Sequence, residues 1–135
     1  MIVVDASVAV RILSREKGAD EALVRVRSAD ARCAPDWIRL EVANAMARKV
    51  REGTIGEAAA RATAAAVTTL VEEQMDSFKL MDAAFGLSLR LKHPMYDCLY
   101  LALAERHDAV MLTTDRKFET SGEQAGLGHR IELLA

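Results

Sequence analysis

With 135 residues, of which 51% are hydrophobic, the chain suits one folded domain and is too apolar to be a disordered segment. The formal net charge of −2 argues against a strongly basic protein that binds nucleic acid without specificity. No apolar stretch approaches the roughly 20 residues of a membrane-spanning helix, and the first residues lack the basic leader of a secretory signal. We therefore expect one cytoplasmic domain over residues 1–135, with no membrane attachment.

Strands and helices are expected to alternate along the chain. The β-branched run Ile2–Val4 is typical of a strand buried in a parallel sheet. Thr54 and Glu57 have the spacing of a capping box, which would open a long alanine-rich helix. Gly53 is expected to end the helix before it, and His93-Pro94 to break another.

In chain order, we expect a strand at Ile2–Val4, helices at Ser7–Leu13 and Ala19–Val26, a strand at Arg32–Ala34, helices at Trp37–Arg51 and 54–73, a strand at Ser77–Lys79, helices at Ala83–Leu91 and Tyr96–Arg106, a strand at Ala109–Thr113, a helix at Arg116–Gln124 and a strand at Arg130–Leu133. This alternation predicts a three-layer α/β/α fold around a mainly parallel sheet.

Acidic residues stand at the ends of these elements. Asp5 ends the first strand and Asp115 follows the Ala109–Thr113 strand, so both are expected at the crevice beyond the carboxyl ends of the sheet. Asp97 opens a helix, and the sequence leaves open which edge of the sheet that helix end faces. Each of these aspartates also stands where it could simply cap a helix.

Glu41 is expected in the middle of a helix, among apolar neighbours. A carboxylate in such surroundings must be paired, protonated or bound to a metal ion. Arg48 lies on the same helix stripe and is the main alternative partner. Four carboxylates from separate elements would suit Mg²⁺, and two ions about 4 Å apart support phosphodiester cleavage. Two such ions would add four charges and bring the net charge of −2 to +2.

Five segments that carry or adjoin these acids form a recurring pattern along the chain. They are Ile2-Val3-Val4-Asp5-Ala6-Ser7-Val8, Ala34-Pro35, Glu41-Val42-Ala43-Asn44-Ala45, Tyr96-Asp97-Cys98-Leu99-Tyr100-Leu101-Ala102-Leu103-Ala104-Glu105 and Leu112-Thr113-Thr114-Asp115-Arg116-Lys117-Phe118. Over nearly the whole chain they resemble the PIN-domain family, particularly the VapC-type toxins of bacterial toxin–antitoxin pairs. Each motif alone is weak, and their order and spacing make the match specific.

The resemblance implies a PIN-like fold with about five parallel strands, on which the four acids converge. It implies a Mg²⁺- or Mn²⁺-dependent endoribonuclease, a homodimer, and control by a cognate antitoxin whose tail occupies the groove. The implied catalytic and metal-binding residues are Asp5, Glu41, Asp97 and Asp115, and the implied supporting hydroxyls are those of Ser7 and Thr113.

The chain departs from the family pattern at one place. Many members have another acid shortly after the position of Asp115, whereas here Arg116 and Lys117 follow and the nearest acid is Glu119. A second ion would therefore be held weakly, or one ion would suffice. Glu119 on a solvated helix face is the simpler interpretation.

Two surface features have both a functional and a plain interpretation. Arg11, Arg15 and Arg48 follow the acidic motifs and are candidates to hold RNA phosphates, although such residues are often merely solvated. The alanine-rich helix 54–73 would suit a dimer or partner surface, or it packs on its own domain.

A PIN-like scaffold that binds RNA or a partner without cleavage, and a housekeeping RNA-processing nuclease, remain alternatives. A phosphoacceptor domain is disfavoured, because Ser7 stands where an aspartyl-phosphate phosphatase has its second Asp and Thr114 where a receiver has its lysine. A Cys98 nucleophile is disfavoured because His107, nine residues along the same helix, would be about 13 Å away, so Cys33 and Cys98 are expected to be reduced and packed.

Overall fold

The computed structural model describes residues 1–135 and is built around one five-stranded sheet. All four strand pairs are parallel, which confirms the expected α/β class. The strands, in the spatial order β3-β2-β1-β4-β5, are β1 (Ile2–Val4), β2 (Arg32–Pro35), β3 (Glu73–Met75), β4 (Val110–Thr113) and β5 (Ile131–Leu133).

Strand β1 occupies the centre of the sheet. Val3 is paired with Cys33 of β2 on one side and with Met111 of β4 on the other. Val3 and Val4 have no exposed surface, as expected for a β-branched run covered on both faces. The short apolar sequence at the start of the chain therefore specifies the core strand.

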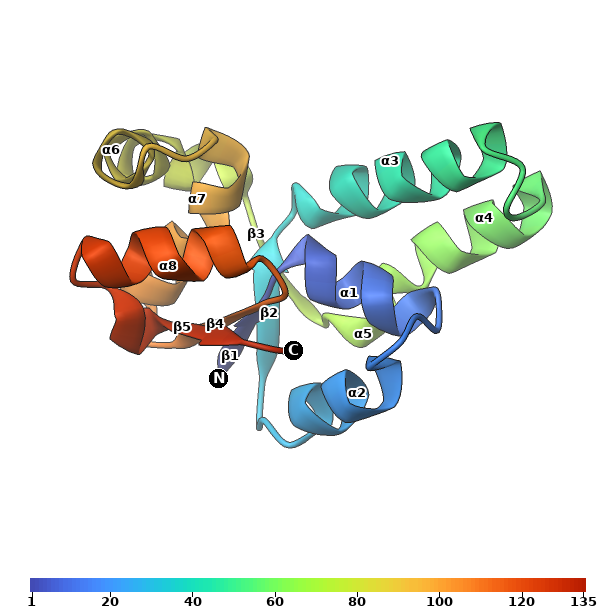
Figure 1. The fold of residues 1–135 in the computed structure, drawn as a ribbon, viewed down its shortest axis with the longest axis horizontal. Helices are drawn as coiled ribbons and strands as arrows, with labels where there is room; N and C mark the ends of the chain where they lie inside the picture. Colours follow the sequence, from blue (N-terminus) through green and yellow to red (C-terminus); the bar gives the residue numbers. More distant parts are fainter.

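Helices cover both faces of the sheet (Figure 1). The links from β1 to β3 run one way across the sheet and those from β3 to β5 run the other way. Right-handed crossovers in opposite directions place their helices on opposite faces. On one face lie α1 (Ala6–Leu13), α2 (Ala19–Arg27), α3 (Ile38–Arg51), α4 (Glu57–Ala65) and α5 (Val67–Leu70). On the other lie α6 (Met81–Leu91), α7 (Met95–Arg106) and α8 (Arg116–Gln124).

Helix α7 forms the centre of the core. Seven consecutive residues, Cys98 to Ala104, are buried, and the helix packs across β1, β2 and β4. A helix that is apolar all round requires cover on every side, and here α6 supplies the outer cover. No helix in the structure is both long enough and apolar enough to cross a membrane.

The expected long helix over 54–73 is wrong. The chain forms α4 and α5 instead, becomes extended at Val71 and enters β3 at Glu73. The capping box is also wrong, because Gly56 is the N-cap of α4 and has no side-chain cap bond. Thr54 Oγ1 donates to the Lys49 carbonyl oxygen, and Glu57 pairs with Arg61 on its own helix.

The alanine-rich segment packs in part on its own domain. Gly53, at φ +77°, ends α3 as predicted and allows the chain to turn back. Helix α4 then packs along α3 through the buried Ala60, and the two form a hairpin that projects from the body (Figure 1). Alanines on the outer side of α4 remain exposed, namely Ala58, Ala59, Ala62 and Ala65.

The strand expected at Ser77–Lys79 lies earlier in the chain. The sheet takes Glu73–Met75, paired with Cys33–Pro35, and Ser77–Leu80 forms a 3₁₀ helix, η1. Asp76 accepts a hydrogen bond from the Phe78 backbone N–H at 2.9 Å. This local side-chain bond favours a turn over continued strand pairing. A second 3₁₀ turn, η2 (Gly128–Arg130), precedes β5.

Candidate active site

The strand order defines where a site is expected. The chain moves outward from β1 in one direction to β2 and β3, and β4 then lies on the other side of β1. Crevices in such sheets form beyond the carboxyl ends of the strands at this switch point. Asp5 directly follows β1 and Asp115 lies two residues after β4, so both stand at the crevice.

Asp5 is the most buried of the four acids, with 6% of its surface exposed. Its Oδ2 accepts hydrogen bonds from Ser7 Oγ at 2.6 Å and from Thr113 Oγ1 at 2.8 Å. Burial raises the pKa of Asp5 from 3.8 to about 6, and the nearby Asp97 adds to this, while the two hydroxyls oppose it. Asp5 precedes α1 but makes no side-chain cap bond, so the cap interpretation does not apply to it.

The hydroxyls of Ser7 and Thr113 also bind the loop after β4. Ser7 Oγ accepts from the Thr114 backbone N–H at 3.1 Å, and Thr113 Oγ1 accepts from the Asp115 backbone N–H at 3.1 Å. Each hydroxyl therefore accepts from this loop and donates to Asp5. This network fixes the orientation of the Asp5 carboxylate relative to the loop that carries Asp115.

Glu41 lies in the first turn of α3, not in the middle of a helix as expected. Its Oε1 accepts a hydrogen bond of 2.8 Å from Tyr100 OH, and no ion pair with Arg48 forms. The pKa of Glu41 is raised from 4.5 to about 7, mainly by burial; the Tyr100 hydrogen bond opposes the shift, and Asp5 and Asp97 add to it. Burial and the nearby acids hold the pKa of Tyr100 well above its usual value, so it remains a donor.

Asp97 lies on the same edge of the sheet as the other acids, which answers the question that the sequence left open. Helix α7 leads directly into β4 and runs antiparallel to it, so α7 begins at the edge where the strands end (Figure 1). Pro94, not Asp97, is the N-cap of α7. Asp97 Oδ2 instead lies 2.7 Å from Nε2 of His93.

Asp115 is the aspartate for which the cap interpretation holds. It is the N-cap of α8, and its Oδ1 accepts from the Phe118 backbone N–H at 3.1 Å. The other oxygen, Oδ2, lies 3.7 Å from His93 Nε2. Capping therefore orients this carboxylate and still leaves one oxygen directed toward the crevice.

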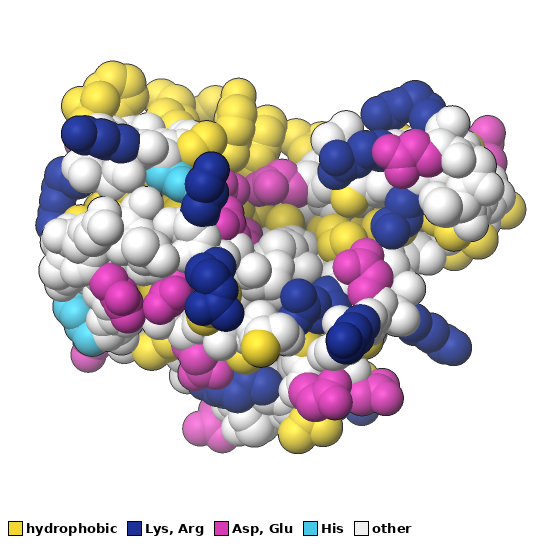
Figure 2. All heavy atoms as spheres, in the orientation of Figure 1, with side chains coloured by type: hydrophobic (Ala, Val, Ile, Leu, Met, Phe, Trp, Pro, Cys, Tyr) yellow, Lys and Arg dark blue, Asp and Glu magenta, His cyan; other side chains and the backbone are white.

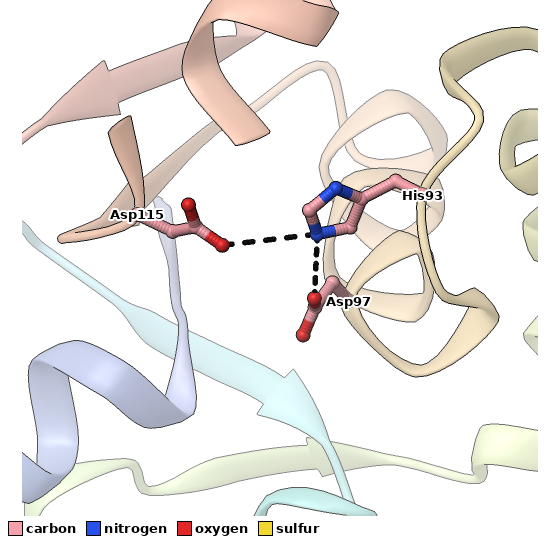
Figure 3. Close-up of side chains that lie close together, drawn as sticks. All are labelled: His93, Asp97 and Asp115. Carbon is pink, nitrogen blue, oxygen red and sulfur yellow. Dashed lines mark hydrogen bonds and ion pairs between the residues drawn. The ribbon is translucent and has the colours of Figure 1, made fainter. Parts of the chain in front are cut away.

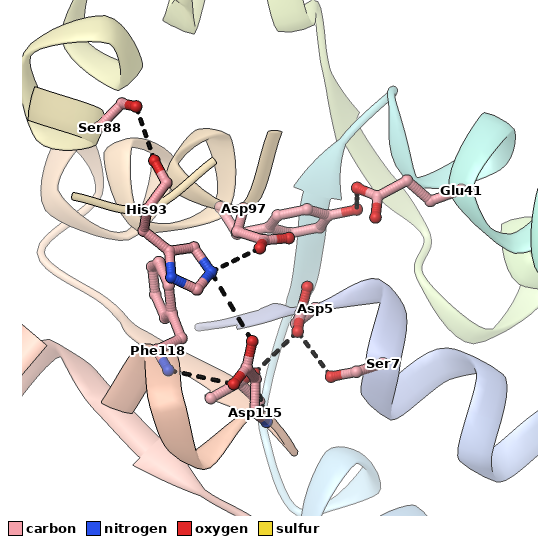
Figure 4. A network of polar contacts seen from close by, with 10 residues as sticks. Asp5, Ser7, Glu41, Ser88, His93, Asp97, Asp115 and Phe118 are labelled. Atoms are coloured by element: carbon pink, nitrogen blue, oxygen red, sulfur yellow. Dashed lines mark hydrogen bonds and ion pairs between the residues drawn. The ribbon is translucent and has the colours of Figure 1, made fainter. Parts of the chain in front are cut away.

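All four acids thus meet in one crevice (Figure 4). Asp5 and Asp97 each raise the pKa of Glu41, and Asp97 raises that of Asp5, so the carboxylates lie close enough to repel one another. Their oxygens are the ligands that hard divalent cations prefer, and a cation would relieve this repulsion. The residues therefore fit a divalent metal centre.

Other acids at this edge are engaged elsewhere. Asp36 follows β2, but its Oδ1 accepts from Ser77 Oγ at 2.6 Å and from the Ser77 backbone N–H at 3.0 Å. Asp76 follows β3 and binds Phe78, as described above. Glu119 lies on α8, half-buried, outside the group of residues around Asp115. Position at the edge is thus not sufficient to join the crevice.

His93 also lies in the crevice, although the sequence predicts only a helix break at His93-Pro94. Its ring nitrogen and the carboxylates of Asp97 and Asp115 all lie within 4.8 Å of one another (Figure 3). The signal that was available is the spacing of four residues between His93 and Asp97, which brings two side chains together at the start of a helix.

The three arginines proposed for RNA binding differ in their surroundings. Arg48 is exposed and lines a groove of about 370 Å³ together with Glu41, Ser7 and Thr114. Arg11 Nη1 donates instead to the carbonyl oxygens of Leu134 and Ala135, at 3.3 and 2.7 Å. Arg15 is exposed beyond the end of α1. Arg48 alone lies beside the acids.

Neither cysteine suits a nucleophile. Cys33 and Cys98 are both buried and unpaired. Burial raises the pKa of Cys33 to about 11 and that of Cys98 to about 12, so neither forms a thiolate readily. This agrees with the expectation of two reduced, packed thiols.

The molecular surface is hollowed at the crevice. Figure 2 shows acidic side chains gathered in a notch between the α6–α8 side and the α1–α5 side, with lysine or arginine side chains on both flanks. Such a distribution of charge suits a site that binds cations at its centre and an anionic substrate along its flanks. The protein is thus a doubly wound sheet with an acidic centre at its switch point.

Comparison with known proteins identifies the class. A sequence model of the PIN domain family matches residues 2–123, and the chain belongs to that family. It is similar to a protein named Ribonuclease VapC3 from Pyrobaculum aerophilum, with 30% identity over 125 residues that cover 86% of this chain and 90% of the relative.

The fold is also similar to a solved structure. The crystal structure of PAE2754 from Pyrobaculum aerophilum matches with a TM-score of 0.70 and 21% identity, covering 89% of this chain and 84% of that one. At this identity the likeness concerns the fold, which agrees with the parallel sheet described above.

Proposed function

We propose that this protein is a metal-dependent endoribonuclease, the toxin of a VapBC-type toxin–antitoxin pair. The observation that carries the proposal is the meeting of Asp5, Glu41, Asp97 and Asp115 at the switch point of the sheet. Membership of the PIN domain family and the name of the ribonuclease relative support it. The expected location is the cytoplasm, where RNA is available.

The four carboxylates are proposed to hold Mg²⁺ or Mn²⁺. When bound, such an ion activates water and neutralises charge on the scissile phosphate. The chain's own part is to hold the carboxylates in place, and a bound cation would favour their ionised forms. Ser7 and Thr113 orient Asp5 through two hydrogen bonds, and Tyr100 orients Glu41 through one.

Substrate binding is assigned to the groove beside the acids. This groove runs between α1 and α3 from Ser7 and Glu41 to Arg48. An arginine at its far end is suited to hold an RNA phosphate while the adjacent phosphodiester approaches the carboxylates. Arg11 and Arg15 are assigned weaker parts, because Arg11 already binds backbone oxygens and Arg15 lies outside the groove.

A cognate antitoxin and a second copy of the chain are the proposed partners. An apolar face, defined by Leu40, Phe78, Met81, Phe85, Leu89 and Tyr96, is exposed around the start of α7 and along α6. Phe78 is 81% exposed, and part of the face forms a groove of about 720 Å³. Large exposed apolar patches are typical of protein interfaces. We assign this face to the homodimer and the groove beside the acids to the antitoxin tail.

Incubation of purified protein with a mixed RNA pool tests the activity. With Mn²⁺ or Mg²⁺ we expect internal cuts, which excess EDTA abolishes. Asp97→Asn should lower the rate about 100-fold or more, whereas Asp20→Asn, at an exposed acid on α2, should leave it unchanged. Intact RNA with every metal would favour a non-cleaving scaffold. An Asp97→Asn protein that is unfolded by circular dichroism would instead indicate a structural role.

The toxin role has a separate test. Expression of the wild-type chain should arrest growth, and the inactive Asp5→Asn chain should not. Co-expression with a small protein encoded beside it should restore growth. Activity on RNA without growth arrest would favour the housekeeping alternative.

A further inference from the structure

The imidazole of His93 is held rigidly at the edge of the acidic crevice. Lys92, in the left-handed conformation, ends α6, and Pro94 begins α7, so His93 is the single residue between two fixed points. Its carbonyl oxygen accepts a 2.6 Å hydrogen bond from Ser88 Oγ. Its ring meets Phe118 edge-on at 4.7 Å, and 13% of the side chain is exposed.

One ring nitrogen faces two carboxylates. His93 Nε2 lies 2.7 Å from Asp97 Oδ2 and 3.7 Å from Asp115 Oδ2 (Figure 3). Neighbouring ligands of an ion with bonds of about 2.1 Å are about 3 Å apart, and opposite ones about 4.2 Å. His93 Nε2 and Asp97 Oδ2 therefore need to separate by only a few tenths of an ångström to become neighbouring ligands, and all three ligand atoms already lie within 4.8 Å of one another, close to the span of one coordination shell.

No further acid lies beside Asp97 and Asp115 in the crevice. Glu119, the nearest acid in sequence after Asp115, stands outside this group of side chains, and Arg116 and Lys117 are exposed. No other carboxylate supplements Asp115 on this side. His93 is the one additional ligand-type side chain that the fold brings to Asp97 and Asp115.

We propose that His93 is a metal ligand, which with Asp97 and Asp115 forms a second divalent-cation position beside the one at Asp5 and Glu41. Asp97 lies between the two positions and contributes to both. A nitrogen donor suits transition ions better than Mg²⁺, so this position selects Mn²⁺ over Mg²⁺. The inference rests on the proposed function and specifies how its site holds metal.

Pulsed electron paramagnetic resonance of the protein loaded with Mn²⁺ alone tests the inference. A coordinated imidazole modulates the Mn²⁺ spin echo through its ¹⁴N nucleus, and ¹⁵N-histidine labelling changes that modulation without any mutation. We expect the histidine signal in wild type and its loss in His93→Gln. Matched controls are His107→Gln and His129→Gln, because both residues are exposed and have no carboxylate partner, and both should keep the signal.

Calorimetry on the same proteins supplies a second readout. Wild type should bind two Mn²⁺ ions, and His93→Gln should bind the second at least about tenfold more weakly. Mg²⁺ should displace Mn²⁺ more readily from the variant than from wild type.

The outcomes separate the two proposals. A wild-type protein that binds Mn²⁺ without a histidine signal, or a signal that persists in His93→Gln, overturns the role of His93 and leaves the metal-dependent nuclease intact. A wild-type protein that binds no Mn²⁺ overturns both. Should His93→Gln fail to fold, the isotope labelling of wild type still decides between a histidine ligand and none.

Discussion

The hydroxyl of Tyr100 donates a 2.8 Å hydrogen bond to Glu41, and this contact joins a helix from one face of the sheet to a helix from the other. Tyr100 has no exposed surface and belongs to α7, whereas Glu41 lies in the first turn of α3. The bond crosses the crevice at the carboxyl end of the sheet. It therefore fixes a half-buried carboxylate that no basic residue neutralises.

Loss of this bond should change the pH dependence of activity. In Tyr100→Phe, Glu41 loses the hydrogen bond that lowers its pKa, so its pKa rises further above about 7. We expect a pH profile of RNA cleavage that moves to higher pH, with a loss of about 1 kcal/mol in stability. Tyr96→Phe is the control, because Tyr96 OH makes no hydrogen bond in the structure. Superimposable pH profiles of wild type and Tyr100→Phe would contradict this role.

Stability of the metal-free protein should fall as pH rises through neutrality. Burial raises the pKa of Asp5 to about 6 and of Glu41 to about 7, so between these values and the ordinary 3.8 and 4.5 the folded state binds more protons than the unfolded state. The contribution of these two groups to the free energy of unfolding is fully present below pH 4 and is lost as pH rises through 6 and 7. At neutral pH the Asp5 shift alone costs about 3 kcal/mol.

Thermal unfolding in EDTA between about pH 5 and pH 8 measures this effect. The melting temperature of wild type should decrease across the range, and Glu41→Gln should decrease less, because its side chain cannot ionise. Added Mn²⁺ at the upper pH should restore wild type. Equal slopes for wild type and Glu41→Gln would show that Glu41 ionises freely in the folded state.

Substitution of single arginines should affect RNA binding and thermal stability separately. Arg48→Ala should raise KM for RNA several-fold and reduce the dependence of binding on salt by about one phosphate contact, with little change in melting temperature. Arg11→Ala should lower the melting temperature, because Arg11 holds the backbone oxygens of Leu134 and Ala135. Arg61→Ala, on the outer hairpin, should do neither.

Fluorescence anisotropy measures the affinity for RNA without cleavage when each arginine variant also carries the inactivating Asp97→Asn change. An Arg48→Ala protein with unchanged affinity and unchanged salt dependence would exclude the groove from substrate binding.

Disruption of the apolar face should yield monomers. The double change Phe78→Ser and Phe85→Ser places hydroxyls where the proposed dimer buries two rings, so the mass in solution should fall from twice 14.8 kDa to the value of one chain. Val24→Ser is the control, since Val24 is 71% exposed on α2, outside this face. Light scattering coupled to size exclusion gives the mass. A wild-type protein that is monomeric at high concentration would remove this face from the dimer proposal.

Much of the fold could be predicted from the sequence, because local signals and the global fold agree along most of the chain. The β-branched run Ile2–Val4, Gly53 after α3 and the apolar run of α7 each indicated an element that the structure contains. The region from Thr54 to Lys79 could not be predicted. There alanine favours a helix, whereas the pairing of Glu73–Met75 with β2 decides that the chain is extended.

By itself the sequence determined which residues carry the carboxylates and that a parallel sheet would bring Asp5 and Asp115 to one edge. It did not determine the partners of those carboxylates. Tyr100 for Glu41, and His93 for Asp97 and Asp115, follow from how α7 crosses the sheet and from where α6 ends. Local spacing reports contacts within an element, whereas contacts between elements depend on their packing, and packing is settled only when the whole core forms.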